Sequence, residues 1–161
     1  MGPSSETVNP MHPLAHILTG ALVGQTGPSP AAAVVGGLLS HLVLDAVPHT
    51  DAETFGVAAG RGLRPDLIEA GLELFVGTAV LGWLVVACPG TQALRVWLGA
   101  LGGLAPDLIA MLTLRFVGAD MAHPPRLHWA VARRHWVWGV LTQAIVAAAA
   151  GLLLWRASGC P

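Results

Sequence analysis

Five apolar stretches, separated by breaks that contain proline or glycine, dominate this sequence of 161 residues. They cover about residues 11–25, 30–47, 65–88, 92–116 and 135–155. A helix needs roughly 20 mostly apolar residues to cross a bilayer. The third and fifth stretches meet that length most clearly, and the first is the shortest. The pattern predicts an all-α protein, an integral membrane bundle of about five helices with four to five spans.

The composition supports a membrane location. Hydrophobic residues make up 54% of the chain and charged residues 11%, whereas charged residues usually make up about a quarter. The mean hydropathy is +0.65 and the net charge is -1. These values argue against a disordered protein, a nucleic-acid binder and an ordinary soluble domain. We therefore expect membrane lipid as a partner, and no nucleic acid.

The chain divides into a short tail and one domain. Residues 1–10, with their Pro, Ser and Asn, predict a flexible N-terminal tail, and residues 11–161 a single helical transmembrane domain. No secretory signal peptide is evident, because Arg61 is the first basic residue and the first apolar stretch carries histidines. Cys88 and Cys160 lie far apart and form no CxxC motif. The sequence therefore predicts neither a disulfide framework nor a thiolate metal site.

The distribution of arginine predicts an orientation. Of the eight basic residues, all arginine, six fall on the side of the N-terminus, in or beside loops 48–65 and 116–134. Arg95 and Arg156 fall on the opposite side. Positive residues are enriched in cytoplasmic loops of membrane proteins. We therefore expect a multi-pass inner-membrane protein whose N-terminus lies on the cytoplasmic side.

Ionisable side chains gather on that same side, although one at the centre of a membrane helix costs about 2.5–3.5 kcal/mol. Three i,i+4 pairs each share a helix face: His12 with His16, His41 with Asp45, and Glu69 with Glu73. Imidazole and carboxylate donors suit Zn²⁺, with Mn²⁺ or Fe²⁺ as alternatives. The predicted ligands of this divalent metal are His16, His41, Asp45, His49, Asp107 and His128.

The segment 40–49 reads SHLVLDAVPH. It resembles the SHxxxDxxPH signature of small bacterial membrane proteins related to the inner-membrane metal-dependent hydrolases, a family grouped with zinc-dependent phospholipase C-like proteins. The segments 12–20, 102–107 and 127–143 are similar to further blocks of these proteins. The resemblance implies a helical membrane protein with a metal-binding pocket. Larger members carry a PDxD motif, whereas here Asp107 is followed by Leu108 and Ile109.

These residues favour a metal-dependent hydrolase that acts on a lipid or lipid-linked phosphoester at the cytoplasmic membrane face. Glu73 or Glu69 is the expected general base, since a carboxylate near a metal-activated water can accept its proton. Arg61 or Arg64, in or beside the loop after the histidine-containing segment, is expected to bind phosphate.

Other functions stay open at this point. The main alternative is a non-enzymatic accessory subunit of a larger membrane complex, with a structural metal site and glycine-rich faces that dock on partner membrane subunits. A tetrapyrrole protein would use His16 and His41 as axial ligands. A proton or ion carrier would use the same intramembrane acids.

Overall fold

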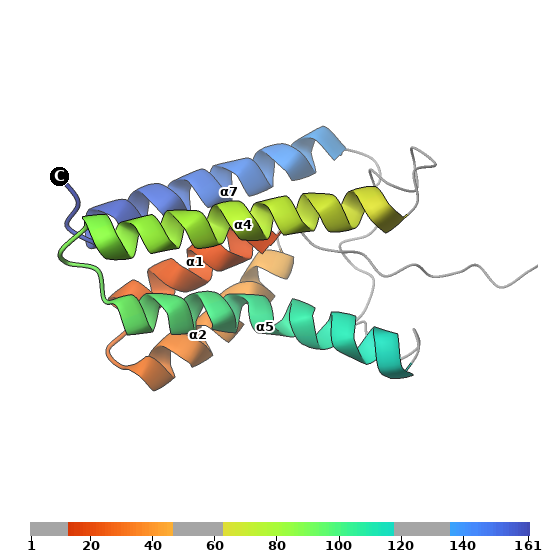
Figure 1. The fold of residues 1–161 in the computed structure, drawn as a ribbon, viewed down its shortest axis with the longest axis horizontal. Coiled ribbons are helices and arrows are strands. Elements are labelled where there is room, and N and C mark those ends of the chain that lie inside the picture. The colour runs from red at the N-terminus through yellow and green to blue at the C-terminus, as the bar shows by residue number, and fades with distance from the viewer. Residues whose placement is uncertain (1–12, 47–62, 118–135) are drawn as a thin grey trace, which may run out of the picture.

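The computed structural model describes residues 13–46, 63–117 and 136–161. In these ranges the chain is helical, without strands (Figure 1). The helices are α1 (Pro13–Thr26), α2 (Pro30–Asp45), α4 (Leu63–Ala87), α5 (Ala93–Val117) and α7 (Trp136–Ala157). The predicted all-α class and the five helices are confirmed for this part of the chain. The tail predicted for residues 1–10 lies outside it.

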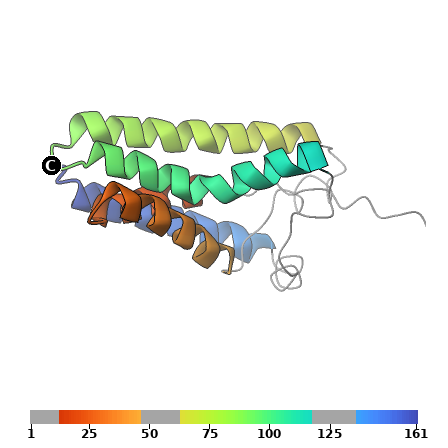
Figure 2. The ribbon, with the colours of Figure 1, turned by 90° about the horizontal axis from the view of Figure 1, so that it is seen from below.

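Helix α1 lies at the centre of the bundle and contacts the other four helices (Figures 1 and 2). Helices α2 and α5 pack closely on it and on each other, whereas α4 and α5 make few mutual contacts. Nine of the 14 residues of α1 are buried. At about 1.5 Å per residue this helix is about 21 Å long. It is therefore a short internal helix, surrounded by longer ones.

Glycine lets the backbones of α1, α2 and α5 touch. Gly20 of α1 lies against Gly99 and Gly103 of α5, and Gly37 of α2 lies against the same two residues. A Cβ atom at Gly103 would lie 2.5 Å from the carbonyl oxygen of His16. Such distances leave no space for any side chain larger than hydrogen, so these positions require glycine.

Local sequence signals explain how α2 begins and why α5 bends. The side chain of Ser29 accepts a hydrogen bond of 3.1 Å from the backbone N–H of Ala32, and Pro30 occupies the first turn. Pro106 lies inside α5, where it has no N–H to donate to the preceding turn. The helix bends along its length, as Figure 2 shows, and a proline inside a helix is a common cause of such a bend.

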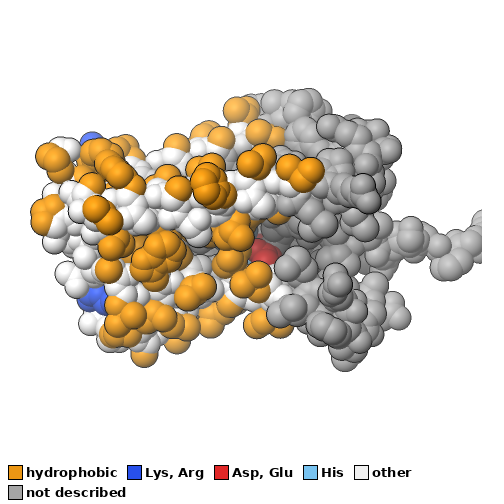
Figure 3. Space-filling view, in the orientation of Figure 1, with side chains coloured by type: hydrophobic (Ala, Val, Ile, Leu, Met, Phe, Trp, Pro, Cys, Tyr) orange, Lys and Arg blue, Asp and Glu red, His pale blue; other side chains and the backbone are white. Residues whose placement is uncertain are grey.

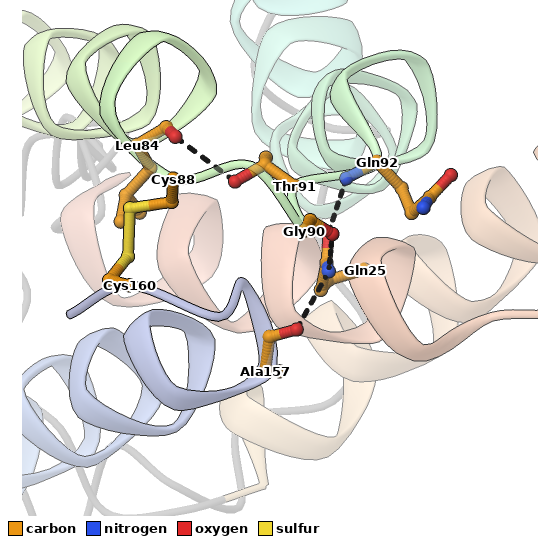
Figure 4. Close-up of a disulfide and its surroundings, with 8 residues drawn as sticks. All are labelled: Gln25, Leu84, Cys88, Gly90, Thr91, Gln92, Ala157 and Cys160. Carbon is orange, nitrogen blue, oxygen red and sulfur yellow. Dashed lines mark hydrogen bonds between the residues drawn. A yellow bond between two sulfur atoms is a disulfide. The ribbon is translucent and has the colours of Figure 1, made fainter.

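A disulfide closes the end of the bundle where α1 terminates (Figure 4). Cys88, directly after α4, is bonded to Cys160, and their Cα atoms lie 4.7 Å apart. The expectation that these cysteines form no disulfide is wrong. Gly159, with a φ of 64°, turns the chain back after α7 and brings together two residues 72 positions apart. Spacing along the sequence contains no sign of this approach.

Gln25 joins three segments at the same end (Figure 4). Its buried amide Nε2 donates hydrogen bonds to the carbonyl oxygens of Gly90 and Ala157, at 2.9 and 3.0 Å. Its Oε1 accepts a hydrogen bond of 2.8 Å from the backbone N–H of Gln92. The end of α1, the α4–α5 turn and the end of α7 are thereby tied together through one satisfied buried side chain.

Apolar side chains are spread over the described surface on the face drawn in Figure 3, and very few charged side chains are visible there. In the described part of the chain, two helices are long and apolar enough to cross a membrane, within Ala70–Ala87 and Gly139–Ala157. Only 17% and 11% of the residues in these windows are buried, so most of them face outward. With 14 and 16 residues, α1 and α2 are shorter than a full span. The predicted four to five spans therefore stay a prediction.

Replacing Gly99 with alanine is expected to destabilise the protein, because the added methyl group would collide with the backbone of Gly20 and Gly24. Overpacking of this kind typically costs about 1–3 kcal/mol. Gly82→Ala in α4 is the matched control, since nothing lies within 4 Å of its added Cβ. Thermal unfolding of detergent-purified protein should show a lower midpoint for Gly99→Ala alone. Equal midpoints for the two variants would contradict the close packing of α1 on α5.

Candidate metal centre

Two histidines and two aspartates from three helices meet at the end of the bundle opposite the disulfide. His16 comes from α1, His41 and Asp45 from the last turns of α2, and Asp107 from α5, directly after Pro106. Ligand atoms of His16, His41 and Asp107 all lie within 4.8 Å of one another. We call these four residues the His/Asp cluster.

A backbone carbonyl orients His41. Its Nδ1 lies 2.7 Å from the carbonyl oxygen of Gly103, which can only accept, so Nδ1 carries the proton. Its Nε2 is directed toward the carboxylates, 3.2 Å from Asp45 Oδ2 and 3.6 Å from Asp107 Oδ1. Histidines that bind metals usually donate their second N–H to a carbonyl or carboxylate in this way. A proton or a metal ion must lie between Nε2 and the carboxylates, because their lone pairs would otherwise face one another.

His16 provides the second imidazole. Its side chain is 4% exposed, and its Nε2 lies 3.8 Å from Asp45 Oδ1. The ring centroids of His16 and His41 are 4.2 Å apart, with the planes tilted by 37°. Rings this close leave no room for a macrocycle between them, which argues against the tetrapyrrole alternative.

The two carboxylates lie between the interior and the surface. The side chains of Asp45 and Asp107 are 27% and 22% exposed. Two ionised carboxylates in one site repel each other, and a divalent cation would compensate their charge. Donor atoms around a tetrahedral metal with bonds of 2.0–2.1 Å lie about 3.3 Å apart. Three donor separations in the cluster, 3.2, 3.6 and 3.8 Å, are close to this value, and the ligand atoms of His16, His41 and Asp107 lie within 4.8 Å of one another. The donors fit Zn²⁺, Mn²⁺ and Fe²⁺ alike.

The structure describes the predicted general base Glu73 at the start of α1. Its carboxylate accepts a hydrogen bond of 3.2 Å from the backbone N–H of Leu14, in the first turn of α1 and two residues before His16. Glu69 and Arg64 belong to α4, but their side chains lie outside the described part of the structure. His49, Arg61 and His128 lie outside it entirely. The structure thus brings together four of the six predicted ligands, and the roles of the other residues stay predictions.

Gly103 contributes to the centre in a way that the sequence did not reveal. Its carbonyl orients His41, and its missing side chain lets α1 bring His16 to the cluster. The pair Gly102–Gly103 in front of Pro106 and Asp107 was a signal for close helix packing. It could not show which carbonyl meets which histidine, because that depends on the register of three helices.

Comparison of the chain with known protein families, with curated proteins and with solved structures finds no match. The resemblance of segment 40–49 to the hydrolase family therefore stays a prediction. The functional conclusion depends on the geometry of the described residues.

The substitution His41→Asn removes the metal ligand Nε2 but keeps a donor for the hydrogen bond to Gly103. The asparagine amide can still donate to the Gly103 carbonyl, but no donor atom replaces Nε2. We expect purified wild-type protein to contain stoichiometric divalent metal, and the variant to lose most of it while remaining folded. Elemental analysis of both proteins measures this. Gly82→Ala, far from the cluster in open space, should keep its metal. Equal metal contents in wild type and His41→Asn would contradict the proposed centre.

Proposed function

We propose that the chain is a multi-pass membrane protein that hydrolyses a lipid or lipid-linked phosphoester with a divalent metal held by the His/Asp cluster. The observation that carries the proposal is the convergence of His16 Nε2 and His41 Nε2 on the carboxylates of Asp45 and Asp107, with His41 oriented by Gly103. The sequence resemblance to membrane metal-dependent hydrolases supports the same activity.

The depth of the cluster suits a lipid phosphoester. Glu73, beside the first turn of α1, lies three residues after Ala70, where the apolar window of α4 begins. At about 1.5 Å per residue this is about 5 Å along the helix. A centre at that level lies near the boundary of the hydrocarbon region, where the phosphates of lipid headgroups are within reach.

The chain's own residues prepare the site for hydrolysis. A bound Zn²⁺ or similar cation would supply Lewis acidity and lower the pKa of a coordinated water toward about 7. His16, His41, Asp45 and Asp107 would hold the ion, and the buried imidazoles keep that side of it dry. Glu73 is the candidate proton acceptor. Glu69 is its alternative, and Arg61 or Arg64 would bind the phosphate.

A second candidate function is that of an accessory subunit with a structural metal. Most of the glycines of α1, α2 and α5 are used in packing within the bundle. At Gly71 and Gly82 of α4, however, an added Cβ atom would meet nothing within 4 Å. These positions leave part of the helix open to a partner helix. Co-purification of other membrane subunits, together with metal but without turnover, would favour this function.

Activity is the test that separates the two functions. His41→Ala and Asp45→Ala should each lower turnover at least about 100-fold, with folding retained, because each removes a metal ligand. The assay uses p-nitrophenylphosphorylcholine and, separately, phospholipid in mixed micelles, with the wild-type protein reconstituted with Zn²⁺. Gly82→Ala is the control. Full turnover in either cluster variant would show that the metal mechanism is wrong.

Glu73→Gln tests the proton acceptor. The glutamine oxygen can still accept the hydrogen bond from Leu14 N–H, so α1 should keep its position. Loss of a general base typically costs about 10²–10⁴-fold in rate. We expect turnover to fall by that factor, with metal content and thermal midpoint unchanged. Unchanged turnover would show that another group accepts the proton, and Glu69 would be the next candidate.

The disulfide supports the orientation that the arginines predict. Cys88 and Cys160 lie at the end opposite the His/Asp cluster. Disulfides persist on the oxidising side of a membrane and are rare in the cytosol. We infer that the disulfide end faces outward and that the cluster lies on the cytoplasmic side of an inner membrane.

In cells, both cysteines should resist alkylation by a maleimide–polyethylene glycol reagent unless the denatured protein is first reduced. The predicted orientation places the C-terminus outside the cytoplasm. A reporter enzyme fused after Pro161 should therefore be active if it is of a kind that works only after export, and inactive if it works only in the cytoplasm. The variant Cys88→Ser provides the control, since it frees Cys160 for labelling without reduction. Labelling of the wild-type cysteines before reduction would contradict the orientation. Activity of a reporter that works only in the cytoplasm would contradict it as well.

A further inference from the structure

His16 lies in the first turn of α1, which is the part of a helix that its own hydrogen bonds hold least. The first backbone N–H groups of a helix have no carbonyl partner within the helix. Helix α1 begins at Pro13, which has no N–H, so Leu14 is its first residue with an N–H that needs an acceptor. The position of a metal ligand in such a turn therefore depends on contacts with other helices.

Helix α4 supplies the acceptor from its inward face. This face carries buried residues at spacings of three and four, namely Gly77, Leu81 and Leu84. Glu73 continues the same face one turn farther toward the start of α4. Its Oε2 accepts the hydrogen bond of 3.2 Å from the N–H of Leu14. A carboxylate at this place also stabilises the positive end of the α1 dipole.

A second contact shows that α4 packs directly on the first turns of α1. A Cβ atom at Gly77 would lie 3.2 Å from the side chain of Ile17 and 3.5 Å from that of Leu14. On α5, Gly103 lies against the carbonyl oxygen of His16. The turn that carries His16 is thus in contact with two helices, and Glu73 provides its polar contact with α4.

We propose that Glu73 is a positioning residue for the metal centre, because its hydrogen bond to Leu14 holds the first turn of α1 and, with it, the imidazole of His16. The inference rests on the metal site proposed above and adds a role that is separate from proton transfer. Without the carboxylate, the partly buried N–H of Leu14 would lose this acceptor and the turn would lose order. His16 Nε2 would then leave its place 3.8 Å from Asp45 Oδ1.

The test titrates detergent-purified apoprotein with Co²⁺, whose visible absorption reports on its ligands. We expect Glu73→Ala to weaken Co²⁺ binding about 10-fold or more, as is typical when a group that orients a metal ligand is removed. Glu73→Gln, whose amide oxygen accepts the same hydrogen bond, should bind within about threefold of the wild type. Val76→Ala, at an exposed position of α4, is the matched control and should bind like the wild type.

A double-variant cycle tests whether the effect passes through His16. In a His16→Ala background, Glu73→Ala should change the Co²⁺ affinity less than about twofold, because the ligand that Glu73 positions is already gone. Gly77→Val is the second variant if Glu73→Ala does not fold, as judged by its thermal midpoint. Its side chain would displace Ile17 and the first turns of α1, so it should also weaken Co²⁺ binding.

Wild-type Co²⁺ affinity in folded Glu73→Ala, or in folded Gly77→Val where that variant replaces it, would overturn the positioning role while the metal site stands. Equal losses in Glu73→Gln and Glu73→Ala would also overturn it, because the carboxylate would then act on the metal directly. So would an undiminished effect of Glu73→Ala in the His16→Ala background. Failure of the wild type to bind Co²⁺, or equal binding by His41→Asn, would overturn the proposed function as well.

Discussion

The direct contact of the α1, α2 and α5 backbones at glycine is the constraint on which the rest of the structure depends. Gly99 and Gly103 of α5 lie against glycines of both α1 and α2. This contact places His16 and His41 beside each other, and it presents the Gly103 carbonyl to the His41 ring. A core of larger side chains would hold the three helices farther apart, and the donor atoms would no longer reach one another. The packing of the three helices and the geometry of the His/Asp cluster therefore depend on the same glycines.

The two ends of the bundle solve the problem of buried polar groups in different ways. At the disulfide end, Gln25 forms hydrogen bonds to three backbone groups, which satisfies its amide within the protein. At the other end, two imidazoles and two carboxylates face one another. A partly buried group of ionisable side chains such as this one needs a proton or a cation between its members to be stable. One end is thus built for stability, and the other has the chemistry of a binding site.

The apolar surface connects the centre with its surroundings. Helices α4 and α7 expose most of their long apolar windows, and α4 and α5 continue past the short helices α1 and α2 (Figure 1). The His/Asp cluster consequently lies between long helices rather than at an exposed tip.

The sequence by itself determined the five helices, since their ends are marked by prolines and glycines, and it determined the pair His41 and Asp45, since a spacing of four residues puts both on one helix face. It also indicated that His16 and Asp107 belong with that pair. Only the tertiary structure decided that Gly103 orients His41, that Glu73 contacts the start of α1, that Gln25 joins three segments, and that Cys88 bonds to Cys160. The reason is physical: local spacing decides which face of a helix a residue occupies, whereas contacts between residues distant in the chain depend on helix register and rotation. Those are set by packing at the glycines.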